Sequence, residues 1–358
     1  MHDGQYVFSQ IVSFLSYKKF DACVRKYAGN KGVRRYTCWQ QFLCMCFGQL
    51  TYRDSLRDIV VCLNVRKVSL YHIGIKAKVS RSTMADANEK RDYRIYEEVA
   101  HILIRETRTL YLDENEFTLD LENMAYVLDS RTIDLCLSTF PWAPFRRSKA
   151  AIKMHTLLDL RGNIPTFVSI THGKVHDVKA LDDIFFEAGA FYVMDKAYMD
   201  TARLHRIHCA SAFFLLPAKE NLQCKRLYSR PVDKQSGIRC DQVIRFKGKH
   251  QAKQYPDKLR RIKYYDAEKA KYFVFLTNDF TVPARTIADL YRYRWQIEEF
   301  FKWVKQHLRI KSFWGVSENA VKTQIWIAVC TYLLVAIIKK KLQLEQSLYE
   351  ILQILSVT

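Results

Sequence analysis

Residues 291 to 308 read Tyr-Arg-Tyr-Arg-Trp-Gln-Ile-Glu-Glu-Phe-Phe-Lys-Trp-Val-Lys-Gln-His-Leu. The segment has no Gly or Pro, and its apolar residues recur at three- and four-residue steps, so the pattern predicts one helix. At about 100° per residue, Arg294, Glu298 and Lys305 fall on the same side of the helix as Tyr291. One face is therefore predicted to carry a single carboxylate among cations.

The adjoining side of this predicted helix is apolar, so it can be buried against a sheet while the charged edge faces a cleft. The apolar positions are Leu290, Ile297, Phe301, Val304 and Leu308. Glu299 points elsewhere, which favours Glu298 as the functional carboxylate. An amphipathic surface helix with an ordinary Arg294–Glu298 pair, four residues apart, fits the same pattern and stays open as an alternative.

Composition indicates a basic globular protein. The chain has 358 residues, 49% of them hydrophobic, and a net charge of +20. Such a charge favours a polyanionic partner, nucleic acid before membrane, although a basic enzyme without such a partner also fits.

Ten cysteines without a CxxC pair indicate reduced, buried thiols in a cytosolic protein. The apolar run 325–338 is too short to span a bilayer comfortably and predicts a buried helix rather than membrane insertion.

The first 110 residues are helical in pattern. The candidate helices are Phe8–Leu15, Cys38–Leu50, Ser55–Leu63 and Tyr93–Leu110. A further helix is predicted from Ser80, a good N-cap residue, to Asn88, and many Lys and Arg surround it in sequence. This helix is either a recognition helix for DNA or part of a plain helical cap on the rest of the protein.

Strand patterns begin near residue 120. They predict strands at Ala125–Asp129, Ile133–Leu137, Lys153–Asp159, Ile164–Ile170, Ala190–Asp195 and Ala210–Leu216, with a helix at Val178–Ala188. This order is that of a ribonuclease H-like domain. Two neighbouring buried strands that end in Asp129 and Asp195 would place these acids side by side. Each Asp alone is equally compatible with a cap or turn residue.

The segment 218–280 is predicted to be an insertion, because it is too long for one helix and one strand. Its candidate strands are Gln242–Phe246, Arg260–Tyr265 and Tyr272–Thr277, joined by segments dense in Lys and Arg. A charged excursion without a partner remains the alternative to a DNA-binding insertion. After residue 311 the pattern is helical again, at 319–339 and 342–355, and we expect these helices to pack behind the 291–308 helix.

The spacing Tyr291-x2-Arg294-x3-Glu298-x6-Lys305 resembles the signature of bacterial insertion-sequence DDE transposases of the insertion-sequence-four type. Other segments match the same family in order: Leu128-Asp-Ser130, Thr132-Ile-Asp-Leu135, Lys153-Met-His-Thr156, Gly173-Lys-Val-His-Asp177 and Val193-Met-Asp-Lys-Ala-Tyr198. The resemblance implies an α/β protein with a ribonuclease H-like core, a β-rich insertion, a helical N-terminal module and a helical C-terminal tail. It divides the chain into a DNA-binding module (1–115), the first part of the core (116–217), the insertion (218–280) and the catalytic helix with the C-terminal helices (281–358).

The resemblance also implies a site. Asp129, Asp195 and Glu298 are the expected catalytic residues and ligands of two Mg²⁺ ions, which Mn²⁺ can replace, because hard cations prefer carboxylate oxygens. Arg294 and Lys305 are expected to bind the DNA phosphates beside the scissile bond, with Tyr291 as a hydrogen-bond donor or stacking surface. Trp295 is either a stacking surface for an unpaired base or a partly buried core residue. His176 and Asp177 are expected to orient the acids.

The implied reaction is metal-dependent DNA cleavage at the inverted-repeat ends of an element, with hairpin formation on those ends, followed by strand transfer into target DNA. A homodimer in the synaptic complex and a bacterial cytoplasmic, nucleoid-associated location are expected. A two-metal nuclease without joining activity and a decayed DNA-binding copy remain alternatives, as does truncation of the C-terminus. Departures from the family pattern bear on activity, since Arg131 can pair with Asp129, His172 replaces an Asp, and Lys196-Ala197 replaces Arg-Gly. The spacing of His155, His172 and His176 does not match a zinc site.

Overall fold

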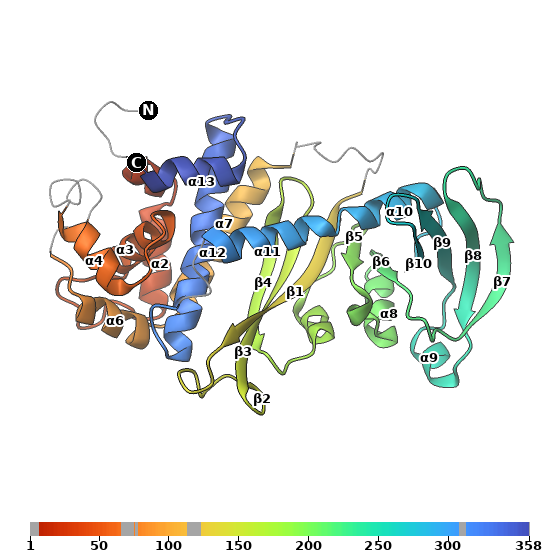
Figure 1. Ribbon diagram of the computed structural model, residues 1–358, viewed down its shortest axis with the longest axis horizontal. Coiled ribbons are helices and arrows are strands. Elements are labelled where there is room, and N and C mark those ends of the chain that lie inside the picture. The colour runs from red at the N-terminus through yellow and green to blue at the C-terminus, as the bar shows by residue number, and fades with distance from the viewer. Residues whose placement is uncertain (1–6, 66–74, 76–77, 113–122, 308–312, 358) are drawn as a thin grey trace. The chain divides into compact units, whose positions relative to one another are not determined.

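The computed structural model describes residues 7–65, 75, 78–112, 123–307 and 313–357 (Figure 1). The chain forms two compact units. One consists of residues 1–113, 132–152 and 300–358, and the other of residues 114–131 and 153–299. The predicted four-part division of the chain remains a prediction.

The first unit is mainly helical. Its helices are α1 (Val7–Ser13), α2 (Tyr17–Lys26), α3 (Cys38–Leu50), α4 (Leu56–Val65), α6 (Arg81–Lys90), α7 (Arg94–Leu110), the C-terminal part of α11 (Trp295–His307), α12 (Glu318–Lys341) and α13 (Leu348–Val357). Local sequence fixes several helix starts. Thr37 and Gln40 form a capping box on α3, and the Ser80 side chain accepts a hydrogen bond from the Thr83 amide at the start of α6. These two predicted helices are confirmed.

Helix α12 is the centre of the helical unit. It is long and apolar enough to cross a membrane by length and composition, but 94% of its most apolar window is buried inside the protein. The Phe300 ring of α11 meets the Tyr332 ring of α12 edge-on, with the ring centroids 5.1 Å apart. The predictions of a buried helix here, and of its packing behind α11, are confirmed.

A ten-stranded sheet contains the strands of the second unit. The strands are β1 (Ala125–Leu135), β2 (Pro144–Arg146), β3 (Lys149–Asp159), β4 (Ile164–His172), β5 (Phe191–Met194), β6 (Phe213–Pro217), β7 (Cys224–Arg230), β8 (Ile238–Phe246), β9 (Leu259–Asp266) and β10 (Lys271–Thr277). They are hydrogen-bonded in the order β2-β3-β1-β5-β6-β10-β9-β8-β7, and β4 pairs with β3. The segment β4-β3-β1-β5-β6 has the strand order of a ribonuclease H-like core, as predicted.

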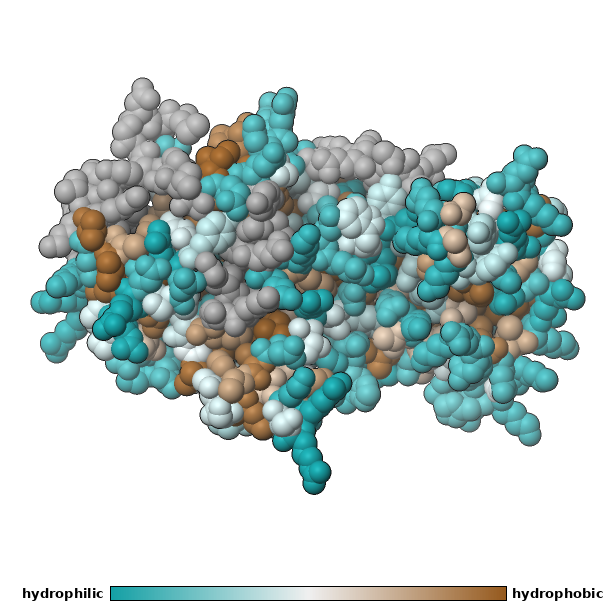
Figure 2. Space-filling view, in the orientation of Figure 1, coloured by the Kyte–Doolittle hydropathy of each residue, from teal (hydrophilic) through white to brown (hydrophobic). Residues whose placement is uncertain are grey.

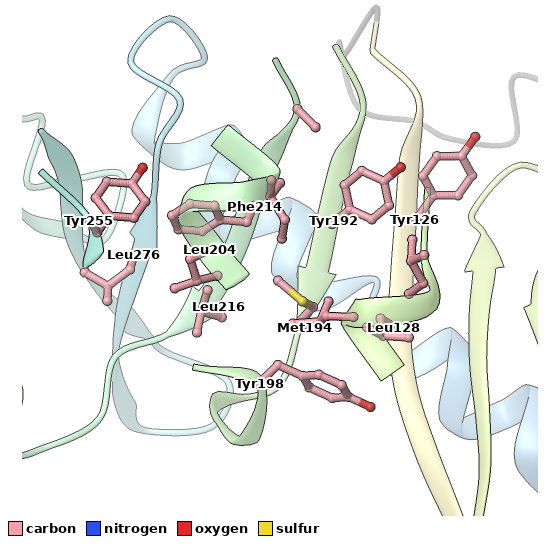
Figure 3. Packing of buried hydrophobic residues seen from close by; sticks show 14 of the residues in the cluster. Tyr126, Leu128, Tyr192, Met194, Tyr198, Leu204, Phe214, Leu216, Tyr255 and Leu276 are labelled. Atoms are coloured by element: carbon pink, nitrogen blue, oxygen red, sulfur yellow. The ribbon is translucent and has the colours of Figure 1, made fainter. Parts of the chain in front are cut away.

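The parallel part of the sheet is the short buried centre of this core. β5 pairs with β1 on one side, from Ala125↔Phe191 to Leu128↔Met194, and with β6 on the other. Apolar side chains from β1, β5, β6 and α8 (Thr201–Cys209) pack together on one face of these strands, as Figure 3 shows for Tyr126, Tyr192, Leu204 and Phe214. Parallel strands need such cover, so the burial fixes their register.

The insertion continues the core sheet sideways. β10 returns to the core as an antiparallel neighbour of β6, and β9, β8 and β7 follow outward as antiparallel strands. Helix α10 (Ala284–Arg292) comes next and leads into α11. The predicted β-rich insertion is thus present.

Several predicted boundaries are wrong. The strands predicted at 125–129 and 133–137 are one strand, β1, so Asp129 lies within a strand and not at its end. The helix predicted at 178–188 is a 3₁₀ helix at Asp177–Asp183, η1. The single helix predicted from Tyr291 is two helices, since Tyr293 and Arg294 form a turn between α10 and α11, and Leu308 lies outside the described residues. The pattern also missed α2, β2, β7, α9 (Lys249–Gln254) and most of α10.

Candidate active site

Two of the three predicted acids meet where β1 and β5 stop pairing. The last paired residues are Leu128 and Met194, so Asp129 and Asp195 are the next residues on two hydrogen-bonded parallel strands. The prediction that two neighbouring strands bring these acids together is confirmed, although β1 itself continues. The Asp195 carboxylate makes no hydrogen bond or ion pair with the part of the chain that the structure describes. Asp195 is therefore available to bind a cation.

Arg294 connects the third acid to this pair. Its Nη1 lies 3.1 Å from Asp129 Oδ2 and its Nη2 lies 2.5 Å from Glu298 Oε1. One guanidinium thus binds two carboxylates that are 169 positions apart in the sequence numbering, one from the sheet and one from α11. Asp129 is 22% exposed and Glu298 is 59% exposed, so the Asp129 end of this bridge is much less open to water.

The turn between α10 and α11 sets the position of Arg294. The amides of Tyr293 and Arg294 donate to carbonyls three residues earlier, those of Leu290 and Tyr291, at 3.2 and 3.1 Å. This is the tighter 3₁₀ geometry, which often marks a functional position inside a longer helix. Below the turn, Leu290 and Ile297 are fully buried, as the apolar stripe predicted.

Burial disfavours the ionised form of the Asp129 carboxyl. It raises the pKa of Asp129 to about 6, while the Ser130 amide and the Arg294 guanidinium act in the opposite direction and Asp195 and Glu298 add repulsion. A carboxylate with a raised pKa beside other carboxylates is typical of a site that awaits a cation.

A second polar group holds the Asp129 segment in place. Asp177, the first residue of η1, accepts hydrogen bonds from Ser130 Oγ at 2.6 Å and from Lys153 Nζ at 2.9 Å. The Ser130 amide in turn donates to Asp129 Oδ1 at 2.7 Å. Burial alone raises the pKa of Asp177, but the hydrogen bonds from Ser130 and Lys153 outweigh it and hold this pKa below its ordinary value. Asp177 therefore orients the Asp129 segment, which supports the role predicted for it.

Tyr198 lies under the acids. Its ring extends the apolar cluster beyond Met194 and Leu128 (Figure 3). The hydroxyl is buried and has no hydrogen-bond partner in the described part of the protein. Burial, followed by the nearby Asp129 charge, raises the pKa of Tyr198 far above its usual range. The hydroxyl is thus a neutral, buried group near the carboxylates of Asp129, Asp177 and Asp195.

The other predicted DNA-binding residues have different surroundings. Tyr291 is half-buried, its ring centroid lies 4.8 Å from that of Phe275, and burial raises its pKa to about 12. Lys305 lies on α11 and is half-exposed, in the helical unit. Trp295 is 51% exposed, which favours the stacking surface over the core residue among the two alternatives.

The residues that depart from the family pattern do not disturb the arrangement of the acids and Arg294. Arg131 is exposed, and the ion pair that Asp129 makes is with Arg294, so Arg131 is not the competing cation that the sequence suggested. Ala197 lies in a short 3₁₀ helix, Lys196–Tyr198, and does not have a positive φ. Glycine is therefore not required at this position. His172 is exposed at the end of β4.

The donor chemistry of the site suits Mg²⁺, because the predicted ligands are carboxylates and not thiols or imidazoles. Within the described residues, the Asp195 carboxylate and the buried Tyr198 hydroxyl have no hydrogen-bond partner, and a cation with its water shell would satisfy both groups. Among the described residues, however, no three His, Cys, Asp or Glu side chains are grouped closely enough to hold a metal ion. Arg294 stands between two of the three acids instead.

Sequence reasoning assigned no role to Lys153, Ser130 or Tyr198. Each lies in a family-like segment quoted above, so a signal was present in the residues adjacent to the acids. What the sequence did not contain was the turn of η1 that brings Asp177 back to Ser130 and Lys153.

Comparisons with known proteins identify the family of the chain. A family model described as a transposase DDE domain matches residues 122–334, and a model described as a domain of unknown function matches residues 3–76. A putative transposase, y4zB, of Sinorhizobium fredii is 32% identical over 258 residues, which are 71% of this chain and 70% of that protein. A probable transposase for insertion sequence element IS5377 of Geobacillus stearothermophilus is 30% identical over 210 residues, which are 58% of this chain and 55% of that protein.

More distant similarities extend further along the chain. A putative transposase for insertion sequence element IS4SA of Synechocystis is 23% identical over 299 residues, or 80% of this chain and 77% of that protein. A solved structure of a piggyBac transposase synaptic complex with hairpin DNA is 12% identical, with a TM-score of 0.49, and covers 97% of this chain and 78% of that chain. The family model alone spans more than half of the sequence. The chain therefore belongs to the DDE transposases of the insertion-sequence type, a family of phosphoryl-transfer enzymes.

Proposed function

We propose that this chain binds the inverted-repeat ends of an insertion sequence, cleaves the DNA there and joins the freed ends to target DNA. The observation that carries the proposal is the meeting of Asp129 and Asp195 at the end of the β1–β5 pairing, with Glu298 joined to Asp129 through Arg294. Acids that converge from two strands and one helix are suited to phosphodiester chemistry with divalent ions. The basic surface supplies the affinity for DNA.

Asp129, Asp195 and Glu298 are the residues that would hold Mg²⁺. When bound, the ions supply an activated oxygen nucleophile and stabilise the leaving oxygen. The chain's own part is to keep the acids in place, and Asp177 does so by fixing Ser130 beside Asp129. Leu128 and Met194, which directly precede Asp129 and Asp195, are fully buried and so fix the backbone at the two acids.

Arg294 has two successive partners in this proposal. Without DNA it neutralises Asp129 and Glu298, which keeps repulsion between the acids low. A DNA phosphate presents the same two-oxygen geometry as a carboxylate, so it competes for the guanidinium. Transfer of Arg294 to phosphate would free both carboxylates for cations when substrate arrives. Lys305 and Tyr291 would add a point charge and a hydroxyl to the phosphate contacts.

We further propose that α6, in the N-terminal helical module, contacts DNA. Arg81, Ser82 and Thr83 are exposed in its first turn, and the buried residues Met84, Ala87 and Asn88 fix its other side. A homodimer that pairs two DNA ends, and action at the bacterial nucleoid in the cytoplasm, complete the proposed setting.

The test uses the full chain, a supercoiled plasmid target and linear DNA that carries the chromosomal sequence flanking this coding sequence. With Mg²⁺ we expect end cleavage and joined products, and both should be lost in the Asp129→Asn and Glu298→Gln variants. Glu299→Gln is the matched control, since Glu299 is also exposed on α11 and has no assigned role at the site. Cleavage without joined products would support a nuclease, and binding without cleavage would support a decayed copy.

A further inference from the structure

Two tyrosines and two cations form a patch on the insertion sheet, which we call the tyrosine patch (Arg239, Lys263, Tyr265 and Tyr272). The ring centroids of Tyr265 and Tyr272 lie 4.9 Å apart. The Arg239 guanidinium lies 5.5 Å from the centre of the Tyr265 ring, and Lys263 Nζ lies 4.7 Å from the centre of the Tyr272 ring. Aromatic rings and cations thus alternate across three strands.

Strand register explains why these side chains share one face. Tyr265 and Tyr272 are direct partners in the β9–β10 ladder, and Lys263 is two residues from Tyr265, so all three point to the same side. Arg239 lies where the register of β8 shifts against β9, between Ile238 and Cys240. Such a bulge redirects a side chain, and here it brings Arg239 over the Tyr265 ring.

The opposite face of the same strands is the covered one. There the Arg285 guanidinium of α10 lies 5.3 Å from the centre of the Tyr264 ring, and Tyr291 packs against Phe275. Alternation along β9 therefore separates a buried side, with Ile262 and Tyr264, from a side open to water. Tyr272 is 53% exposed on that open side, although a ring of its size usually gains from burial.

The net charge of the insertion is more positive on its surface than its composition suggests. Residues 218–280 contain 16 Lys and Arg and 7 Asp and Glu. Three of the acids, Asp241, Asp266 and Asp279, are buried, whereas Arg260 is the one buried cation in this fully described stretch. Figure 2 shows the region over β7 to β10 mostly in the hydrophilic colours. The tyrosine patch therefore lies in a strongly positive surface that complements a polyanion.

We propose that the tyrosine patch binds single-stranded DNA, with bases stacked on Tyr265 and Tyr272 and phosphates held by Arg239 and Lys263. The inference rests on the proposed function in taking DNA as the ligand, and it adds the form of DNA that the insertion recognises. A duplex hides the faces of its bases and needs only cations for its phosphates, whereas unpaired bases bind exposed aromatic rings.

The experiment measures binding of the full-length protein to a labelled oligothymidine of about 12 nucleotides, within the range of single-strand sites, and to a duplex of the same length. Fluorescence anisotropy is followed at one salt concentration without Mg²⁺. The Tyr265→Leu/Tyr272→Leu variant should bind the single strand about 30-fold more weakly or worse, since it removes two stacked bases that contribute about 1–3 kcal/mol each. Its affinity for the duplex should change less than about threefold, because the cations that contact phosphates remain.

Two controls separate stacking from folding. The Tyr265→Phe/Tyr272→Phe variant keeps both rings and should bind the single strand within about twofold of the unmodified protein, since stacking does not need the hydroxyl. Tyr228→Leu removes a tyrosine of β7 with the same 53% exposure as Tyr272 and should leave single-strand binding unchanged. The single Tyr272→Leu variant replaces the double variant if the latter fails to fold, as judged by circular dichroism.

Equal loss of single-strand and duplex binding in the Leu variants would overturn the proposal, because it would mean that the tyrosine patch contacts only phosphates and no bases. Unchanged single-strand binding would overturn it as well. If no cleavage activity is found but the Leu variants lose single-strand binding, the proposed function fails and the tyrosine patch stands.

Discussion

Replacing Asp129 by Asn should stabilise the metal-free protein at neutral pH, although it removes a proposed catalytic residue. Folding raises the pKa of Asp129 from 3.8 to about 6, chiefly through burial. Since each pKa unit corresponds to about 1.4 kcal/mol, this rise corresponds to about 3 kcal/mol of lost stability once the carboxyl is ionised in both states. The Asn side chain has no charge to bury and can still accept the Ser130 amide hydrogen bond.

The pH dependence gives the sign of this effect a direct check. A carboxyl whose pKa is raised by folding destabilises the protein increasingly as pH rises from about 4 to 6, and fully above that range. The gain from Asp129→Asn should therefore be about 3 kcal/mol at pH 7.5 and about 1 kcal/mol at pH 4.5. Urea denaturation followed by far-ultraviolet circular dichroism with EDTA present measures both values.

Asp177→Asn is the matched control, because it changes a neighbouring acid whose pKa folding lowers. A depressed pKa stabilises the protein above the unfolded value, and this stability is lost as pH falls through the folded one. Asp177→Asn should therefore destabilise the protein at pH 7.5, by about 1–3 kcal/mol for weakened charge-assisted hydrogen bonds. A lower urea midpoint for Asp129→Asn at pH 7.5 would refute this reasoning. A gain in the free energy of unfolding that does not depend on pH would also refute it, because burial of the ionised Asp129 would then not destabilise the protein.

Further predictions concern Mg²⁺, the insertion and the buried hydroxyls. Millimolar Mg²⁺ should raise the melting temperature of the unmodified protein when it is bound to end DNA, but not that of the DNA-bound Asp129→Asn variant, as scanning calorimetry would show. Arg260→Met should cost about 3–5 kcal/mol in urea denaturation, because it removes the buried cation that pairs with Asp279 and leaves Asp241 with only Arg230, at 4.0 Å. Tyr198→Phe should leave stability unchanged or raise it by up to about 1 kcal/mol, since its hydroxyl lacks a partner in the described structure, whereas Tyr126→Phe, which loses a hydrogen bond to a carboxylate, should cost about 1 kcal/mol. Duplex binding should weaken steeply as salt rises in an anisotropy titration.

The part of the fold that was predictable is the part where periodicity is strong. The bounds of α3 agree with the prediction at both ends, because Thr37 begins the helix and the apolar residues continue to Leu50. The adjacency of Asp129 and Asp195 was predictable because buried parallel strands carry continuous apolar runs. β7 was missed, since this edge strand has no buried side and hence no alternation to detect.

The site was predictable in its residues but not in its contacts. A helical wheel places Arg294 and Glu298 on one face, yet it assumes an unbroken helix and therefore misses the turn at Tyr293. The reach of Arg294 to Asp129 depends on the tertiary position of that turn, which periodicity does not encode. The same limit applies to Asp177, whose contact with Ser130 arises from a 3₁₀ helix where the pattern predicted an α-helix.

The chain between β10 and α10 is short and tied down at several points. Asp279 accepts hydrogen bonds from the amides of Thr281 and Val282, and Arg260 of β9 donates to the Val282 carbonyl at 2.6 Å. A short connection fixed by these hydrogen bonds cannot change its length easily, so a displacement of β10 is expected to displace α10 as well. If DNA binds the outer strands as proposed, we expect a force on those strands to reach α10 and, through it, Arg294. Ligand binding at the insertion would then be coupled to release of the acids by Arg294.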